Sequence, residues 1–67
     1  MTTCGAIKHV VHDKGFGFIT GDDGSDYFFH HSEVALGVFA ELQPGVRVRF
    51  SPTAGPKGAR AEAVQRV

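Results

Sequence analysis

The stretch Lys14-Gly15-Phe16-Gly17-Phe18-Ile19 decides how this sequence folds. Phe16 and Phe18 are two residues apart, so on a β-strand both rings point to the same face. Gly15 and Gly17 alternate with them and point the other way. This spacing alone leaves two arrangements open, with the two rings either in the core or exposed to solvent.

A second aromatic stretch, Asp26-Tyr27-Phe28-Phe29-His30-His31-Ser32, follows shortly after the first. On a strand, Tyr27 and Phe29 share one face, and Phe28 and His30 share the other. A small barrel has a single interior, so only one of these faces can be core. The chain has six Phe and one Tyr in 67 residues, more than a thin core needs. We therefore predict that one aromatic set is exposed.

Exposed flat rings beside basic side chains are typical of a platform on which nucleic-acid bases stack. Phe16, Phe18 and Phe28 would form this platform, with Lys8 and Lys14 beside it. The alternative is that these three rings are ordinary core residues, as a lone Phe would be. Glycine spacing and a second aromatic strand favour the platform.

Short runs of alternating apolar and polar residues, separated by turn sequences, predict an all-β protein. The strands are expected at Ala6–Val11, Phe16–Thr20, Asp26–His31, Val46–Phe50 and Ala59–Val67. Turns are expected at Gly21–Ser25 and Gly55–Gly58, and a longer loop at Leu36–Gln43. Five short strands with one long connection predict a small closed barrel of the five-stranded oligonucleotide-binding (OB) type.

Four local details accompany this prediction. Ile7 and Val10 should both point inward, with an irregularity between them, and Val64 should be core. Pro52 should end its strand or lie at an edge. Ser32 should cap a single helical turn, with Glu33 near the positive end of that turn.

Length and charge limit the function. A chain of 67 residues makes one domain, 1–67, with a thin core and no deep catalytic cleft. Seven Lys and Arg balance seven Asp and Glu, so nucleic-acid binding would contact bases more than phosphates.

Cys4 is the lone cysteine, which suits a reducing compartment. No signal peptide is expected at the start, and Val34–Ala40 is too short to span a membrane. We expect a cytoplasmic protein.

The histidines and Ser32 do not make a convincing catalytic or metal site. His9 and His12 should point to opposite faces, and the adjacent His30 and His31 should diverge. No cysteine or carboxylate completes a tetrahedral ligand set, so we expect no metal and no cofactor. Ser32 lacks a third group that would orient a base, so we expect no enzyme and no small-molecule substrate.

The two aromatic stretches resemble the two ribonucleoprotein motifs of bacterial cold-shock proteins. The residues Gly5–Lys8, Pro44-Gly45-Val46 and Gly55–Gly58 fall where that family has its first strand and later turns. The resemblance covers essentially the whole chain and implies an antiparallel five-stranded barrel. It also implies binding of single-stranded RNA or DNA with modest sequence preference, and a role as an RNA chaperone or a cold-shock-type regulator.

The resemblance implies a role for individual residues. The residues that would stack with bases are Phe16, Phe18, Phe28, His30 and Phe39. Those that would contact phosphates are Lys8, Lys14 and Lys57, and Asp26 would lie near a base edge. His9 stands where the family usually has Trp, Val10-Val11 where it has Phe-Asn, and His31 where it has Phe. Imidazole is a smaller stacking surface, so His9 and His31 should give weaker binding. Tyr27 replaces a smaller inward Val, which requires some core rearrangement.

One rival function uses the same surface. The exposed aromatic patch could dock onto another protein, since such patches mark either kind of partner. Flanking lysines and the two motifs favour nucleic acid, and we expect a monomer.

Overall fold

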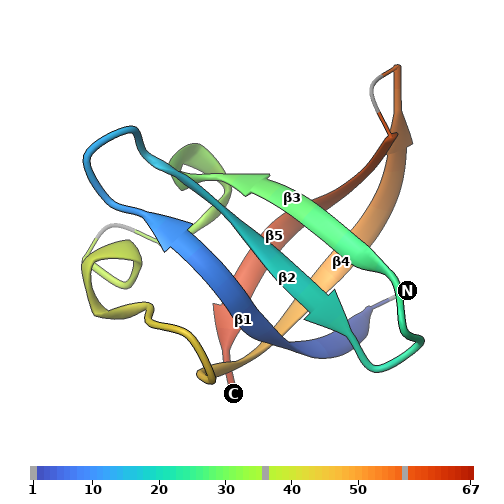
Figure 1. The fold of residues 1–67 in the computed structure, drawn as a ribbon, viewed down its shortest axis with the longest axis horizontal. Coiled ribbons are helices and arrows are strands. Elements are labelled where there is room, and N and C mark those ends of the chain that lie inside the picture. Colours follow the sequence, from blue (N-terminus) through green and yellow to red (C-terminus); the bar gives the residue numbers. More distant parts are fainter. Residues whose placement is uncertain (1, 36, 57) are drawn as a thin grey trace.

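The computed structural model describes residues 2–35, 37–56 and 58–67. Five strands form a closed barrel with the order β1-β2-β3-β5-β4 (Figure 1). The strands are β1 (Thr3–Val11), β2 (Phe16–Gly21), β3 (Asp26–His30), β4 (Arg47–Gly55) and β5 (Gly58–Arg66). Two 3-10 turns, η1 (His31–Glu33) and η2 (Phe39–Glu41), lie between β3 and β4. The predicted five-stranded barrel is confirmed.

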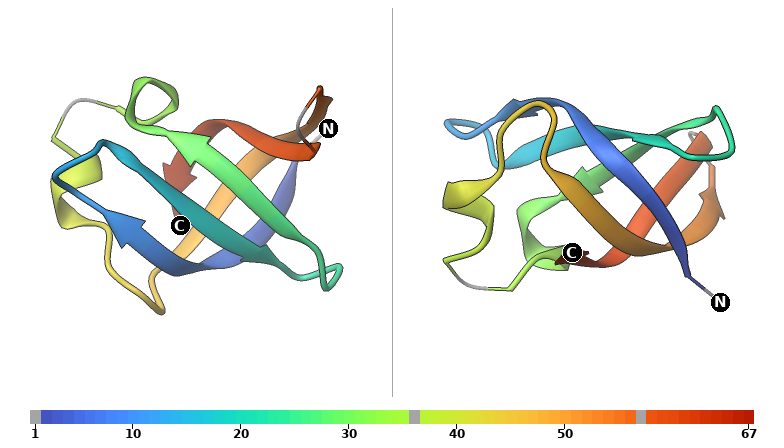
Figure 2. Two further views of the ribbon diagram at one scale, coloured as in Figure 1. Left: turned by 45° about the horizontal axis from the view of Figure 1, so that its top comes forward. Right: turned by 90° about the horizontal axis from the view of Figure 1, so that it is seen from below.

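The first three strands form an antiparallel meander, and β4 pairs antiparallel with both β1 and β5. The barrel closes where β5 runs parallel to β3, with Phe28 paired to Arg60. The views in Figure 2 show β1, β2 and β3 as one continuous wall, with η1 and η2 gathered at one end of the barrel. The outer surface of this wall carries the candidate site.

The core is apolar and comes from all five strands and the β3–β4 connection. Its buried members are Ile7, Ile19, Tyr27, Phe29, Val34, Leu42, Val48, Phe50, Ala61 and Val64. The predicted core positions of Ile7 and Val64 are confirmed, and Val10 packs partly buried against the cluster. Tyr27 also points inward, and its hydroxyl donates a hydrogen bond to Asp23 Oδ2 at 2.6 Å. The larger inward residue is thus accommodated with its polar end satisfied.

The predicted irregularity in the first strand is a β-bulge. The register places Ile7 opposite Ile19 but His9 opposite Phe18, so Lys8 is the extra residue. Ile7 and Val10 therefore both face the core, while Lys8 and His9 are both exposed. A bulge re-aims side chains in this way because it interrupts the strict alternation of a strand. Here it brings two polar side chains to one surface.

A second bulge lies in β5, opposite Phe50. Ala63 adopts a left-handed backbone conformation there, with φ of 51°. The Ala63 N–H, displaced from the β4 ladder by the bulge, donates to Glu33 Oε1 at 3.3 Å. This contact ties η1 to β5.

Several predicted boundaries were wrong. β1 begins at Thr3 rather than Ala6, and β4 continues to Gly55 rather than ending at Phe50. Pro52 stays within β4 because β1 pairs with β4 only from Arg47 to Phe50, so that edge of β4 needs no donor from Pro52. The edge alternative for Pro52 is therefore correct.

The predicted loop from Leu36 to Gln43 contains η2, and Leu36 lies outside the described residues. The predicted turn at Gly55–Gly58 closes through a pair between its two glycines, and Lys57 also lies outside the described residues. Within the described ranges, the structure contains no helix long and apolar enough to cross a membrane.

Candidate nucleic-acid interface

Three phenyl rings form an aromatic triangle on the outer face of β2 and β3. Phe16, Phe18 and Phe28 have centroid separations of 5.7 to 6.2 Å. Phe18 and Phe28 are direct cross-strand partners, and Phe18 is 36% exposed. None of the three belongs to the buried core cluster, whereas Tyr27 and Phe29 do. The predicted outward orientation is confirmed, and the core alternative is wrong.

Gly17 explains how this orientation is possible. It lies on the inward face of β2, opposite Phe29 of β3. A Cβ on Gly17 would lie 2.8 Å from two atoms of the Phe29 ring, closer than real Cβ contacts allow. The glycine therefore gives the inward Phe29 its room, while its neighbours Phe16 and Phe18 face outward.

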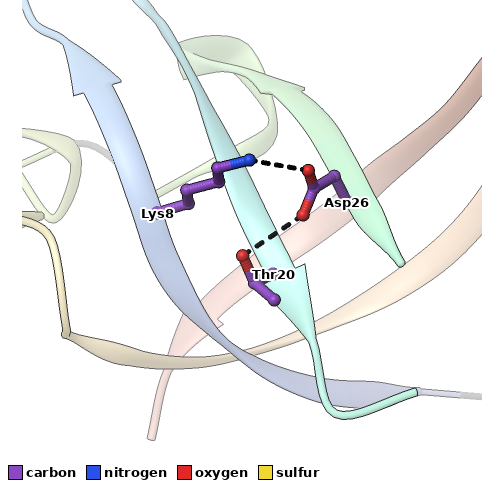
Figure 3. Close-up of polar contacts among 3 residues, drawn as sticks. All are labelled: Lys8, Thr20 and Asp26. Carbon is purple, nitrogen blue, oxygen red and sulfur yellow. Dashed lines mark hydrogen bonds and ion pairs between the residues drawn. The ribbon is translucent and has the colours of Figure 1, made fainter. Parts of the chain in front are cut away.

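A polar rim made of Lys8, Thr20 and Asp26 extends across the adjacent strands β1, β2 and β3 (Figure 3). Lys8 Nζ donates to Asp26 Oδ2 at 2.8 Å, and Thr20 Oγ1 donates to Asp26 Oδ1 at 3.2 Å. The hydrogen bond from Lys8, and its positive charge, hold the pKa of the Asp26 carboxyl below its usual range. Asp26 is therefore an ionised acceptor at neutral pH, and Lys8 is already paired. An exposed pair of this kind contributes little to stability, so a ligand can open it.

Two adjoining shallow hollows lie beside Phe18 and Phe28. Both contain Phe18, Phe28 and Ala59. The first hollow extends to Lys8, His9 and Asp26, and the second extends to Pro56 and Arg60. The predicted residues Lys8, His9, Phe18, Asp26 and Phe28 thus share one surface.

Sequence reasoning missed Arg60, together with Pro56 and Ala59. The Arg60 guanidinium carbon lies 5.9 Å from the centre of the Phe28 ring, in cation–π geometry. Nothing near Arg60 in the sequence indicates a neighbour on β3. Only the parallel pairing of β5 with β3 brings the two side chains together.

The two adjacent histidines do not diverge as predicted. The His30 and His31 rings lie 4.2 Å apart with an interplanar angle of 38°. The prediction failed because β3 ends at His30, and the backbone then turns into η1. Strand alternation therefore does not apply to His31.

The capping role predicted for Ser32 is also wrong. His30 is the cap of η1: its Nδ1 accepts a hydrogen bond from the Ser32 N–H at 3.2 Å. The Ser32 hydroxyl lies 2.9 Å from the same nitrogen. Glu33 lies in the first turn of η1 as predicted, and it accepts from Ala63.

Phe39 lies at the end of the barrel and is partly buried. Its ring is 6.2 Å from Phe29, 5.3 Å from His12 and 6.0 Å from His31. It therefore extends the aromatic surface through His31 and His30 rather than touching the triangle directly. Gly15, with φ of 78°, lets the β1–β2 turn pass close to His31: a Cβ there would lie 2.5 Å from the His31 ring.

The cations of the described residues differ in their partners. Arg47 pairs with Asp22 and Arg66 with Glu41, so both are neutralised within the fold. Lys14 is exposed in the β1–β2 turn, and across residues 2–35, 37–56 and 58–67 it forms no ion pair. The predicted phosphate contact Lys57 lies outside the described residues. Among the side chains with described placement, no three His, Cys, Asp or Glu residues gather as metal ligands.

The barrel belongs to a known structural class. It matches the solved structure of drosophila Unr CSD456 with a TM-score of 0.80 and 24% sequence identity, over 100% of this chain and 27% of that one. This likeness establishes the fold, an all-β barrel of the OB type.

The sequence comparisons define the family more closely. Residues 3–67 match the family model of the 'Cold-shock' DNA-binding domain. The chain is 45% identical to the cold shock-like protein CspA of Stigmatella aurantiaca, over 94% of both chains. It is 43% identical to cold shock protein 2 of Lactiplantibacillus plantarum, over 91% of this chain and 92% of that protein. It is also 43% identical to the cold shock protein CapB of Pseudomonas fragi, over 91% and 88%.

The chain therefore belongs to the cold-shock domain family, a family of nucleic-acid-binding proteins.

Proposed function

We propose that this protein binds single-stranded RNA and DNA, with modest sequence preference, by stacking bases on the aromatic triangle. The observation that carries this proposal is the placement of Phe16, Phe18 and Phe28 together on the outer face of β2 and β3. Solvent-exposed rings attract bases because every base has an apolar π-face, and stacking contributes about 1–3 kcal/mol per base.

The surrounding residues supply the remaining contacts. His30, His31 and Phe39 continue the stacking surface toward the end of the barrel, and His9 borders the triangle on β1. Lys8, Lys14 and Lys57 contact phosphates, and Asp26 accepts a hydrogen bond from a base edge. With zero net charge, the protein relies on bases more than on the backbone.

Stacking on unpaired bases also supports an RNA-chaperone role. A protein that binds the single strand but not the duplex shifts the equilibrium toward the melted form by mass action. Weak hairpins would open, and stable ones would not. We propose that the protein acts in this way as a single-domain monomer in the cytoplasm.

The experiment is a titration of fluorescently labelled dT7 and rU7 with the parent protein and with Phe18→Ala. The parent should bind saturably, and Phe18→Ala should weaken binding by about 1–3 kcal/mol while the protein remains folded. Val67→Ala, which trims an exposed apolar side chain at the chain end, is the control and should bind as the parent does. Loss of folding in Phe18→Ala with unchanged affinity per folded molecule would refute the stacking role.

The same titration separates the rival function. Absence of saturable binding to either strand would favour a protein partner for the aromatic triangle. The chaperone role has its own readout, the opening of a weak hairpin labelled with a fluorophore and a quencher. An unopened hairpin at saturating protein would refute that role.

A further inference from the structure

Arg60 lies beside the ring on which a base is proposed to stack. Its guanidinium carbon lies 5.9 Å from the centre of the Phe28 ring, and the two residues are paired across β3 and β5. Arg60 is exposed and borders the second hollow with Pro56 and Ala59. A base that stacks on Phe28 from this side therefore meets the guanidinium.

The hydrogen-bond donors of Arg60 are available to a ligand. Arg47 donates twice to Asp22 at 2.9 and 3.0 Å, and Arg66 donates to Glu41 at 3.0 Å. Arg49 donates to the Gln65 amide oxygen at 3.4 Å. Over the part of the chain that the structure describes, Arg60 is the arginine with no side-chain acceptor. Its position is maintained by the Phe28 ring rather than by a carboxylate.

Resting on the proposed function, we propose that Arg60 selects guanine for the base position beside Phe28. A guanidinium is a planar fork of donors, and guanine offers two adjacent acceptors, O6 and N7, that match it bidentately. Adenine places an amino donor where guanine has O6, which opposes the same contact. Thymine and uracil offer a single carbonyl there, and cytosine again presents a donor.

The location of Arg60 favours recognition of the edge of the base. Stacking on Phe28 would fix the plane of the base, and Arg60 lines the same hollow, where the edge of that base would lie. Phe16 and Phe18 hold the Phe28 ring on its other sides, at 5.7 Å each. Arg60 thus adds base selectivity to a surface whose stacking is indifferent to sequence.

The test compares rU7 with the same heptamer carrying one central G, for the parent and for Arg60→Lys. The parent should bind the G-containing strand about 5- to 20-fold more tightly, the lower part of the range for a bidentate arginine–guanine pair. Arg60→Lys keeps the charge and loses the fork, so it should bind the two strands within about 2-fold of each other. Arg49→Lys, an exposed arginine on β4, is the matched control and should keep the preference.

Two base analogues make the test specific to the atoms proposed. A strand with 7-deazaguanine, which lacks N7, should lose most of the gain with the parent protein. A strand with inosine keeps O6 and N7 and lacks only the amino group, so it should retain the gain. If inosine loses the gain and 7-deazaguanine keeps it, the amino group is recognised instead, as by the Asp26 carboxylate, and the Arg60 assignment is overturned.

The remaining outcomes distinguish this inference from the proposed function. Equal binding of the U and G strands by the parent, or a preference that survives in Arg60→Lys, overturns the role of Arg60 alone. Failure of the parent to bind any heptamer overturns the proposed function and this inference with it.

Discussion

Gly17 lies directly opposite Phe29 in the β2–β3 ladder, with no room between them for a side chain. A Cβ on Gly17 would approach two atoms of the Phe29 ring and the His9 carbonyl oxygen to 2.8 Å. This contact connects the core to the site, because the buried Phe29 fixes the register that leaves Phe16 and Phe18 outside.

Gly17→Ala should therefore destabilise the protein by about 1–3 kcal/mol, the usual consequence of overpacking a core. Urea unfolding measures the change. Gly55→Ala is the control, since the nearest atom to its Cβ would belong to the flexible Arg60 side chain, at 3.1 Å, and the Gly58 carbonyl oxygen would lie at an ordinary 3.6 Å. Equal stability of Gly17→Ala and the parent would mean that Phe29 can shift without loss.

The Lys8–Asp26 pair predicts how binding responds to salt. The parent should show a log–log slope of about 1.4, since Lys14 and Lys57 each contribute about 0.7 on single strands and the charge of Lys8 is balanced by Asp26. Asp26→Asn releases Lys8 from its partner at 2.8 Å, so the slope should steepen by about 0.7. The measurement is a dT7 titration at several salt concentrations.

Asp22→Asn is the matched control for this release, because it frees Arg47 on β4, away from the aromatic triangle. Its slope should equal that of the parent. A parent slope steeper than about five, or the same slope in Asp26→Asn as in the parent, would contradict the expected balance between bases and phosphates.

The Tyr27–Asp23 hydrogen bond should make stability depend on pH in a defined direction. The Tyr27 hydroxyl, and next the Ser25 N–H, lower the pKa of Asp23 in the folded protein. The folded state thus binds this proton less readily than the unfolded chain. The stability from this carboxylate is therefore complete above its ordinary pKa of about 3.9 and is lost as the pH falls through the lowered value.

Tyr27→Phe keeps the ring that packs 4.8 Å from Phe50 and removes only the hydroxyl. It should be less stable than the parent at pH 7, and the difference should shrink at pH 3. Urea unfolding of both proteins at the two pH values checks this. A difference as large at pH 3 as at pH 7 would show that the carboxylate is not its source.

A substitution at Ala63 should increase the stability of the protein, whereas Gly17→Ala and Tyr27→Phe should decrease it. Its φ of 51° is unfavourable for any residue with a Cβ, by about 1–2 kcal/mol, and glycine adopts it without this penalty. After the larger backbone entropy of glycine is subtracted, Ala63→Gly should raise the free energy of unfolding by about 0.5–1 kcal/mol. Thermal or urea unfolding provides the value.

Ala54→Gly is the control, at an exposed β4 position with ordinary φ. It should lower stability by about 0.5–1 kcal/mol. If both glycine variants are destabilised, the bulge in β5 does not store the strain that its backbone angle indicates.

The sequence by itself was sufficient for the strands, the barrel and the face that carries the aromatic triangle. Strand alternation is local, since side chains two residues apart share a face wherever the strand lies. The spacing of Phe16 with Phe18, and of Tyr27 with Phe29, therefore separated surface from core. The bulge near Lys8 was also predictable, because Ile7 and Val10 can both face inward only if alternation is interrupted between them.

The tertiary structure decided the pairings between residues from distant segments of the chain. The closure of the barrel through β3 and β5 placed Arg60 over Phe28, and the order β1-β2-β3 let Lys8 on β1 reach across β2 to pair with Asp26 on β3. The end of β3 at His30 stacked His30 on His31, where alternation predicted divergence. No local pattern contains these relationships, because the register of one strand against another is set by which side chains fill the shared core.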